Sequence, residues 1–100
     1  MLAREWRCKW SEDDGKKSLA DLQRVLAAHL PALKALPGAK VQRIVCGTCH
    51  DFKVITSLPR KDFAAWESVG FAPEAEALAD MKAVDGATNI ETQTYTLMEQ

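Results

Sequence analysis

The hydrophobic and polar positions of the chain alternate with two different periods, and the change of period marks out the expected elements. In residues 3–10, AREWRCKW, Trp6, Cys8 and Trp10 fall on one side with charged residues between them. A period of two with aromatic residues predicts a strand with one buried face. The polar run SEDDG at residues 11–15 predicts the turn that follows this strand.

The next segment, residues 16–36, predicts a helix with one apolar stripe. The leucines of this stripe recur at spacings of three and four, and they are Leu19, Leu22, Leu26, Leu30 and Leu33. Pro31 lies inside the pattern, and proline removes a backbone donor and clashes with the previous turn. We therefore expect a kink or a break near His29–Leu30. The run LPG at residues 36–38 is typical of a helix end.

Two short apolar segments, residues 39–46 and 52–58, flank a tight turn and predict a β-hairpin. One face of the hairpin is the more apolar and is expected to face the core; it carries Val41, Arg43, Val45, Phe52, Val54 and Thr56. The other face carries Gln42, Ile44, Cys46, Asp51, Lys53 and Ile55.

The last part of the chain predicts two short helices and a closing strand. Pro59 opens a helix that carries Phe63 and Trp66, and Pro73 begins another helix after a glycine-containing break. The threonine-rich residues 88–98 predict the final strand.

The resulting order, βαββαβ, predicts one α+β domain over residues 1–100 with the ferredoxin-like arrangement. In that arrangement a four-stranded antiparallel sheet has its helices on one face. The other face has no cover within the chain, and it carries Ile44, Cys46 and Ile55 among polar residues. Pairing with a second copy would cover it, so we expect a homodimer that forms through the open sheet face.

Composition and charge narrow the classes of function. The chain has 100 residues and a formal net charge of −1, and its basic residues form no cluster. Neither a nucleic-acid partner nor an acidic membrane is therefore predicted. The sequence contains no secretory signal and no apolar run long enough for a membrane span, which predicts a cytoplasmic protein. In that reducing compartment the three cysteines are expected to be free thiols.

The hairpin turn carries the densest chemistry in the sequence, Cys46-Gly47-Thr48-Cys49-His50 followed by Asp51. Its spelling matches the c-type haem attachment pattern, but that motif normally opens a helix in an exported protein. A redox Cys-x-x-Cys pair would need an activating helix N-terminus, and zinc would need a fourth ligand such as Cys8 or His29. A plain hairpin without metal or cofactor is the expected interpretation, and haem, metal and redox roles stay open as alternatives.

Several stretches resemble the dimeric α+β barrel superfamily over nearly the whole chain: the topology, LPGA at residues 36–39 and DGATNIETQTYTL at residues 85–97. The turn at residues 47–52 is similar to the Gly-x-Tyr-Asp turn of the effector domain in Lrp/AsnC-type regulators, with one extra residue and no Tyr before Asp51. That resemblance implies a small-effector site near residues 47–51, at a subunit interface. The chain contains no DNA-binding helix-turn-helix.

A second resemblance is to the small antibiotic-biosynthesis-monooxygenase-like and haem-degrading enzymes of the same superfamily, which work in a cavity between helices and sheet. Trp66 resembles the tryptophan on their second helix. The resemblance implies a cofactor-independent enzyme that acts on an aromatic or polyketide-type substrate. His50 is the expected general base, because imidazole titrates near neutrality, and Asp51 is expected to orient it or to bind ligand. The other expected ligand-binding residues are Trp6, Arg43, Phe63 and Trp66.

Two functions from different classes follow. The first is a dimeric module that binds a small metabolite in a regulatory or sensing role, because no nucleophile, base and orienting group converge in the sequence. The second is the monooxygenase-like or isomerase-like enzyme. Haem or metal binding through Cys46, Cys49 and His50 is a third hypothesis, which a Soret band or bound metal would reveal.

Overall fold

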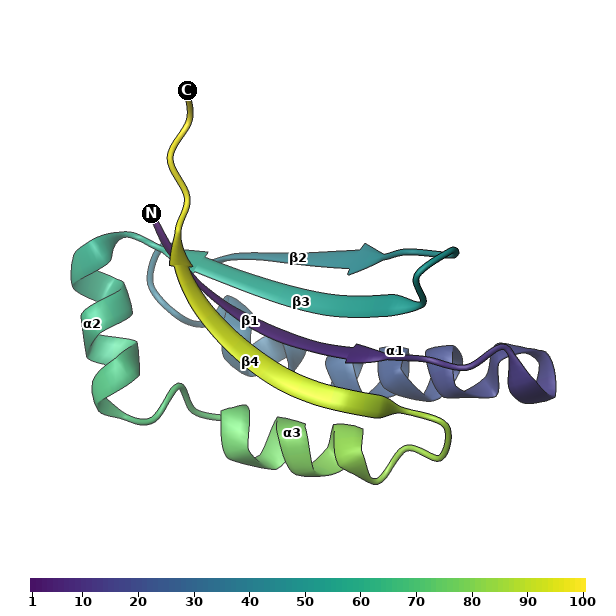
Figure 1. Ribbon diagram of the computed structural model, residues 1–100. Coiled ribbons are helices and arrows are strands. Elements are labelled where there is room, and N and C mark those ends of the chain that lie inside the picture. The colour runs from purple at the N-terminus through teal and green to yellow at the C-terminus, as the bar shows by residue number, and fades with distance from the viewer.

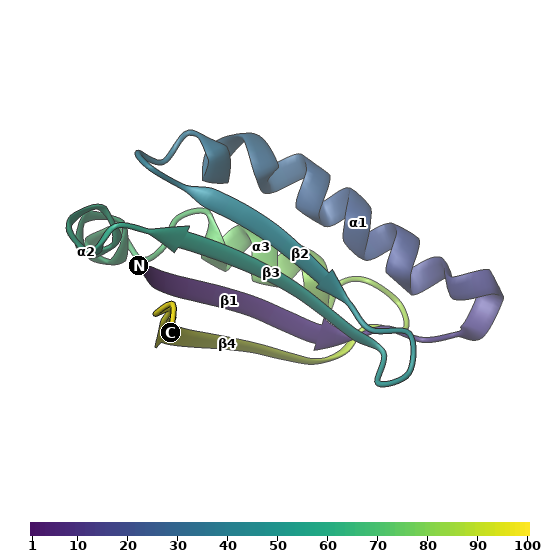
Figure 2. The ribbon, with the colours of Figure 1, turned by 90° about the horizontal axis from the view of Figure 1, so that it is seen from above.

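The computed structural model describes residues 1–100 as a single sheet with helices on one side. Its elements are β1 (Leu2–Lys9), α1 (Asp13–Lys34), β2 (Lys40–Val45), β3 (Asp51–Leu58), α2 (Arg60–Ser68), α3 (Glu74–Lys82) and β4 (Thr88–Thr96). The strands pair antiparallel in the order β2-β3-β1-β4. Figures 1 and 2 show all three helices on one side of the strands, which confirms the predicted ferredoxin-like α+β fold. None of these helices combines the length and the apolar character that a membrane crossing requires.

The core lies between the helices and one face of the two central strands. Trp6 and Cys8 of β1 are buried on this face, and Trp10 is buried just beyond the strand. In the sheet register Trp6 lies opposite Val54 and Cys8 lies opposite Phe52, and both residues of β3 are buried as well. The period-two pattern therefore identifies the core side of β1 and β3 correctly.

The edge strand β2 contributes little to the core. Val41 is half-buried, whereas Arg43 and Val45 on the same face are exposed. Arg43 reaches the first helix, where its guanidinium donates a hydrogen bond to the side-chain oxygen of Gln23. The assignment of the Val41 face to the core is thus confirmed on β3 and holds only at one end of β2, because an edge strand is covered from one side only.

The long helix α1 is interrupted at a different place from the one expected. Asp14, Gly15 and Lys16 have left-handed backbone angles, with φ values of 54°, 64° and 65°. The helix then continues through Pro31 to its end, so no break occurs near His29–Leu30, where a kink or a break was expected. Pro31 costs the helix one backbone hydrogen bond, because its nitrogen carries no hydrogen to donate to the carbonyl one turn earlier.

The third helix, α3, is fastened to the sheet by a largely buried ion pair. Arg4 donates through Nε to Glu74 Oε1 at 2.7 Å and through a terminal nitrogen to Oε2 at 3.1 Å. The indole nitrogen of Trp6 donates to the same Oε1 at 2.9 Å. The guanidinium of Arg4 also lies over the ring of Phe71, 4.3 Å from its centre. These contacts fix the start of α3 against β1.

Candidate functional site

A small apolar cavity lies between α1, α3 and the core face of the sheet. Its volume is about 10 Å³, and its walls are Trp6, Leu22, Val25, Leu26, His29, Phe52, Val54, Ala77 and Met81. Eight of these nine residues are hydrophobic. A space of this size corresponds to about one water molecule, so the helices close over it. Its walls offer a ligand apolar contacts from α1, α3 and the sheet.

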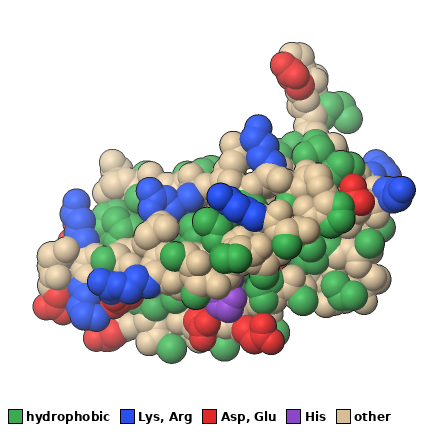
Figure 3. All heavy atoms as spheres, turned by 180° about the vertical axis from the view of Figure 1, so that it is seen from behind, with side chains coloured by type: hydrophobic (Ala, Val, Ile, Leu, Met, Phe, Trp, Pro, Cys, Tyr) green, Lys and Arg blue, Asp and Glu red, His purple; other side chains and the backbone are tan.

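His29 is the one polar residue of this cavity. It extends from α1, and its Nε2 lies 2.8 Å from Asp80 Oδ2 on α3. The imidazole is mostly buried, whereas the carboxylate side chain of Asp80 is 56% exposed. The view from behind, in Figure 3, shows a histidine at the surface beside acidic side chains on the helix side of the molecule. A base paired with an orienting carboxylate therefore stands at the edge of the apolar cavity.

The helical spacing of the sequence could have identified His29 as a candidate site residue, although composition alone could not. His29 follows Leu22 and Leu26 at helical spacing, so it falls on the same stripe as the leucines that α1 buries. A titratable residue on a buried stripe is a candidate for function. Its partner Asp80 comes from a helix 51 residues away and could not be identified from local pattern.

His50 lies elsewhere, at the start of β3. Its ring packs edge-on against Trp10 with 4.7 Å between ring centres, and its backbone oxygen accepts a hydrogen bond from Trp10 N at 2.9 Å. The Nε2 atom is buried and has no hydrogen-bond partner, and Glu12 Oε2 is 3.9 Å away. His50 and Trp10 border a wide, shallow hollow of about 430 Å³. His50 therefore borders the hollow, and its buried Nε2 atom has no hydrogen-bond partner.

Asp51, the first residue of β3, points to the bare face of the sheet, because the next residue, Phe52, is buried on the core face and neighbouring residues of a strand alternate in direction. Its Oδ1 lies 2.5 Å from Lys9 Nζ, and its Oδ2 lies 3.9 Å from Lys53 Nζ. The hydrogen bond from Lys9 holds the pKa of Asp51 below its ordinary value. No hydrogen bond or ion pair joins Asp51 to His50, so the structure does not assemble these two into a base and its orienting group.

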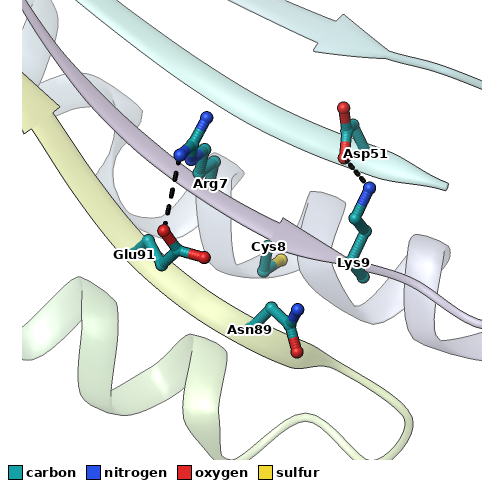
Figure 4. A pocket seen from close by; sticks show the side chains of 6 residues that line it. All are labelled: Arg7, Cys8, Lys9, Asp51, Asn89 and Glu91. Atoms are coloured by element: carbon teal, nitrogen blue, oxygen red, sulfur yellow. Dashed lines mark hydrogen bonds and ion pairs between the residues drawn. The ribbon is translucent and has the colours of Figure 1, made fainter. Parts of the chain in front are cut away.

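Asp51 borders a polar hollow of about 230 Å³ on the bare face of the sheet. The hollow opens where the register of β1 and β4 shifts between Arg7 and Lys9. Figure 4 shows Arg7 directed toward Glu91 and Lys9 directed toward Asp51, on either side of the opening. The distances are 3.4 Å for the Arg7–Glu91 pair and 2.5 Å for the Lys9–Asp51 pair. Its charges are therefore already neutralised within the chain.

The cysteines are not all free, in contrast to the expectation. Cys46 and Cys49 form a disulfide, and Cys8 is a buried free thiol. The turn brings the two Cα atoms within 5.7 Å, which lies in the range that a disulfide bridges. Burial raises the pKa of Cys8 to about 11, with a further contribution from Asp51. The cysteines and histidines form no group arranged to hold a metal ion.

The predicted aromatic residues of the second helix lie in a compact cluster. Trp66 packs edge-on against Phe63 and Phe71, with ring centres 6.0 Å and 5.1 Å away, and all three are buried. The indole nitrogen of Trp66 donates to the backbone oxygen of Ala72 at 2.9 Å. Trp66 lines none of the three cavities described above. The structure thus distributes the expected ligand-binding residues over separate places, and of these only Trp6 lines the apolar cavity.

Comparison with known proteins gives a fold and no sequence family. No protein-family model and no curated protein matches the chain. A candidate antibiotic biosynthesis monooxygenase from Deinococcus radiodurans has a TM-score of 0.70 at 13% identity, over 100% of this chain and 95% of that one. The heme-degrader MhuD from Mycobacterium tuberculosis, solved with two hemes in its active site, has a TM-score of 0.61 at 17% identity, over 100% of this chain and 98% of that one.

A third similar structure is SnoaB, a cofactor-independent oxygenase from Streptomyces nogalater. Its TM-score is 0.57 at 14% identity, over 99% of this chain and 92% of that one. These likenesses span the whole chain and confirm the ferredoxin-like fold of the monooxygenase-like proteins that the residues resemble. Identities this low establish a shared fold, and function has to be argued from the site itself.

Proposed function

We propose that this protein binds a small, mainly apolar metabolite between α1, α3 and the sheet, in a sensing or regulatory role. The observation that carries the proposal is the cavity itself, whose walls are apolar except for His29. Small-molecule sites combine apolar walls with few polar groups that fix orientation. His29 supplies that polar group, and the flat indole of Trp6 supplies a surface for an aromatic ring.

Entry of a ligand requires α3 to move away from α1. The His29–Asp80 contact is the one side-chain hydrogen bond between these two helices. Because Asp80 is more than half exposed, this contact contributes at most about 1 kcal/mol. The hydrogen bond therefore adds little to the cost of separating the helices, which lies mainly in exposing the buried side chains of Ala77 and Met81. The Arg4–Glu74 pair holds the start of α3 in place. The cavity widens from its closed volume when the middle and end of α3 swing outward.

Thermal shift and NMR measurements test this proposal with indole and 2-naphthol as probes. A probe that binds raises Tm in a concentration-dependent way and shifts the resonances of Leu26 and Met81. Ala77→Val narrows the cavity by two methyl groups and is expected to weaken binding about tenfold. Ala79→Val makes the same change on the exposed side of α3 and serves as the matched control.

Two outcomes contradict the proposal. One is the absence of any shift in Tm or in the resonances of the lining residues with either probe. The other is equal probe affinity in Ala77→Val and Ala79→Val, which would place the bound probe outside the cavity. Circular dichroism of both variants checks that each retains the native fold.

We further propose that the bare face of the sheet pairs with a second copy of the chain. On this face Glu5 is buried, and its Oε2 lacks a hydrogen-bond donor while Oε1 accepts from Tyr95. Arg7 lies between Glu5 and Glu91, and Ile44 stands exposed nearby in the sheet. The face carries charges of both signs that pair within the chain and leaves Ile44 exposed, so a two-fold copy can cover the apolar side chain without burying an unpaired charge.

Sedimentation velocity tests the dimer. Ile44→Lys places a charge in the proposed interface and is expected to raise the dimer dissociation constant at least about tenfold. Val69→Lys makes the same change at an exposed apolar residue beyond the end of α2 and is the control. A wild-type chain that sediments as a monomer at every concentration contradicts the proposal.

A second candidate function is a cofactor-independent oxygenase or isomerase that acts on an aromatic or polyketide-type substrate. The specific observation in its favour is His50 Nε2, which is buried beside an open hollow without a partner. Such a nitrogen can accept a proton from an acidic C–H or O–H group of a substrate. Oxygen consumption with anthrone, an enolisable aromatic ketone, tests it. Activity that is absent in wild type, or unchanged in His50→Ala, rejects this function.

A further inference from the structure

The Cys46–Cys49 pair is placed where external molecules can reach it. The β2–β3 turn projects beyond the end of the sheet (Figures 1 and 2), away from the helix-covered core. Cys49 is exposed and Cys46 is half-buried. The third cysteine, Cys8, is buried at 2% exposure under the helices and is separate from this pair. An accessible disulfide is the kind that exchanges with external thiols.

The two sulfur atoms have different electrostatic surroundings. Cys46 Sγ accepts a hydrogen bond from the backbone N–H of Cys49 at 3.1 Å. Cys49 Sγ lies 3.3 Å from Asp51 Oδ2. A backbone donor stabilises a thiolate, whereas a neighbouring carboxylate repels it. Negative charge is therefore better accommodated on Cys46 than on Cys49.

The turn is also held together by contacts that do not depend on the disulfide. Cys46 N donates to Asp51 O at 3.0 Å, which closes the end of the hairpin. Lys9 Nζ donates to Cys49 O at 2.9 Å and pairs with the Asp51 carboxylate, so β1 anchors the turn (Figure 4). After reduction these contacts keep the two thiols close together. Re-formation of the bond is then an intramolecular reaction with a high effective concentration.

We propose that Cys46-Gly47-Thr48-Cys49 is a reversible thiol–disulfide exchange site that reacts with a dithiol, with Cys49 as the attacked sulfur and Cys46 as the leaving thiolate. Exposure of Cys49 and stabilisation of the departing thiolate on Cys46 favour the same direction, and the Lys9 ammonium, 2.5 Å from Asp51, offsets the repulsion between that carboxylate and the incoming thiolate. A thiolate of the dithiol reaches the exposed Cys49 Sγ, and the expelled thiolate forms on the sulfur that has a backbone donor. This activity is independent of the apolar cavity and of metabolite binding.

The exchange balances in two steps. In the first, a thiolate of the dithiol attacks Cys49 Sγ, a mixed disulfide forms, and the electron pair of the S–S bond leaves with Cys46. In the second step, the remaining thiolate of the dithiol attacks the dithiol sulfur that is bonded to Cys49, and Cys49 leaves as a thiolate. Cys46 and Cys49 each end with a proton from the dithiol or from water. Two electrons pass to the protein, and the dithiol becomes a cyclic or linked disulfide.

The first measurement follows the number of free thiols. The Cys8→Ala chain is equilibrated in mixtures of reduced and oxidised dithiothreitol, quenched with N-ethylmaleimide and analysed by mass spectrometry. We expect two populations, with zero or two labels, that interconvert reversibly as the ratio changes. Single labelling at every ratio, two labels at every ratio, or covalent dimers in place of the intramolecular bond would overturn the site.

The second measurement locates the attacked sulfur. The oxidised Cys8→Ala chain is treated briefly with glutathione, quenched in acid and digested, and peptide mapping identifies the cysteine that carries glutathione. We expect Cys49 to carry it in preference to Cys46, and Asp51→Asn to reduce that preference about fivefold, since one nearby charge is removed. An equal distribution in both chains, or a preference for Cys46, would overturn the assigned direction. Circular dichroism confirms that Asp51→Asn is folded.

Discussion

Replacement of Glu74 by alanine tests how α3 is attached to the sheet. Its carboxylate accepts two hydrogen bonds from Arg4 and one from the indole of Trp6. The side chains of Arg4 and Glu74 are only 17% and 13% exposed. In Glu74→Ala the indole N–H loses its acceptor, and the guanidinium loses its only charged acceptor and keeps the hydroxyl oxygens of Thr92 and Thr94. This is the situation in which loss of one member of an ion pair is strongly destabilising.

The expected magnitude follows from burial. Removing one partner of a buried pair costs about 3–5 kcal/mol, and the remaining solvent contact of this pair places it at the lower end, about 3 kcal/mol. For a domain of 100 residues this corresponds to a fall in Tm of roughly 12 °C. Urea unfolding followed by tryptophan fluorescence and by far-UV circular dichroism measures it, provided that the two transitions coincide.

The control is Glu76→Ala, in the same first turn of α3. Glu76 is exposed and takes part in no ion pair, so its loss is expected to change the free energy of unfolding by less than about 0.5 kcal/mol. Equal destabilisation by the two substitutions would refute the role of the Arg4–Glu74 pair. The double variant Arg4→Leu with Glu74→Leu removes both charges, and we expect it to be more stable than Glu74→Ala.

Two further substitutions test the backbone and the buried thiol. Gly38 has φ of +71°, and an added Cβ would lie 3.0 Å from Pro59 Cδ, so Gly38→Ala should lower the free energy of unfolding in urea by about 1–2 kcal/mol. The control is Gly47→Ala, because Gly47 has open space around it. Equal effects of the two substitutions would contradict this prediction. Because burial raises the pKa of Cys8 to about 11 from about 9, its contribution to stability is present below pH 9 and is lost as pH rises toward 11. Cys8→Ala should reduce the pH dependence of the urea midpoint between pH 8 and 10.5. If the variant and wild type show the same pH dependence, Cys8 is not its cause.

The local sequence pattern was sufficient to predict the sheet, but it could not predict the contacts that attach α3 to the sheet. The alternation of Trp6 and Cys8 identifies the core side of β1, because side-chain direction in a strand repeats every two residues. The Arg4–Glu74 pair joins residues 70 apart in sequence, and the residues around either one do not predict its partner. A helix break at Pro31 does not occur for a related reason: proline has a local cost, and packing of the leucine stripe on both sides of Pro31 outweighs that cost.

The candidate site shows the same contrast between local sequence and tertiary packing. His50 lies just before β3 with a left-handed φ of 61°, and its ring packs against Trp10 on the helix side, whereas Asp51 begins β3 and turns toward Lys9 on the bare face. A histidine and a carboxylate meet instead at His29 and Asp80, on two helices that pack side by side. Adjacency in sequence therefore does not bring the two groups of the hairpin together, whereas helix packing joins groups that are distant in sequence. A base and its orienting carboxylate in this fold are therefore better sought across the α1–α3 contact than along the hairpin.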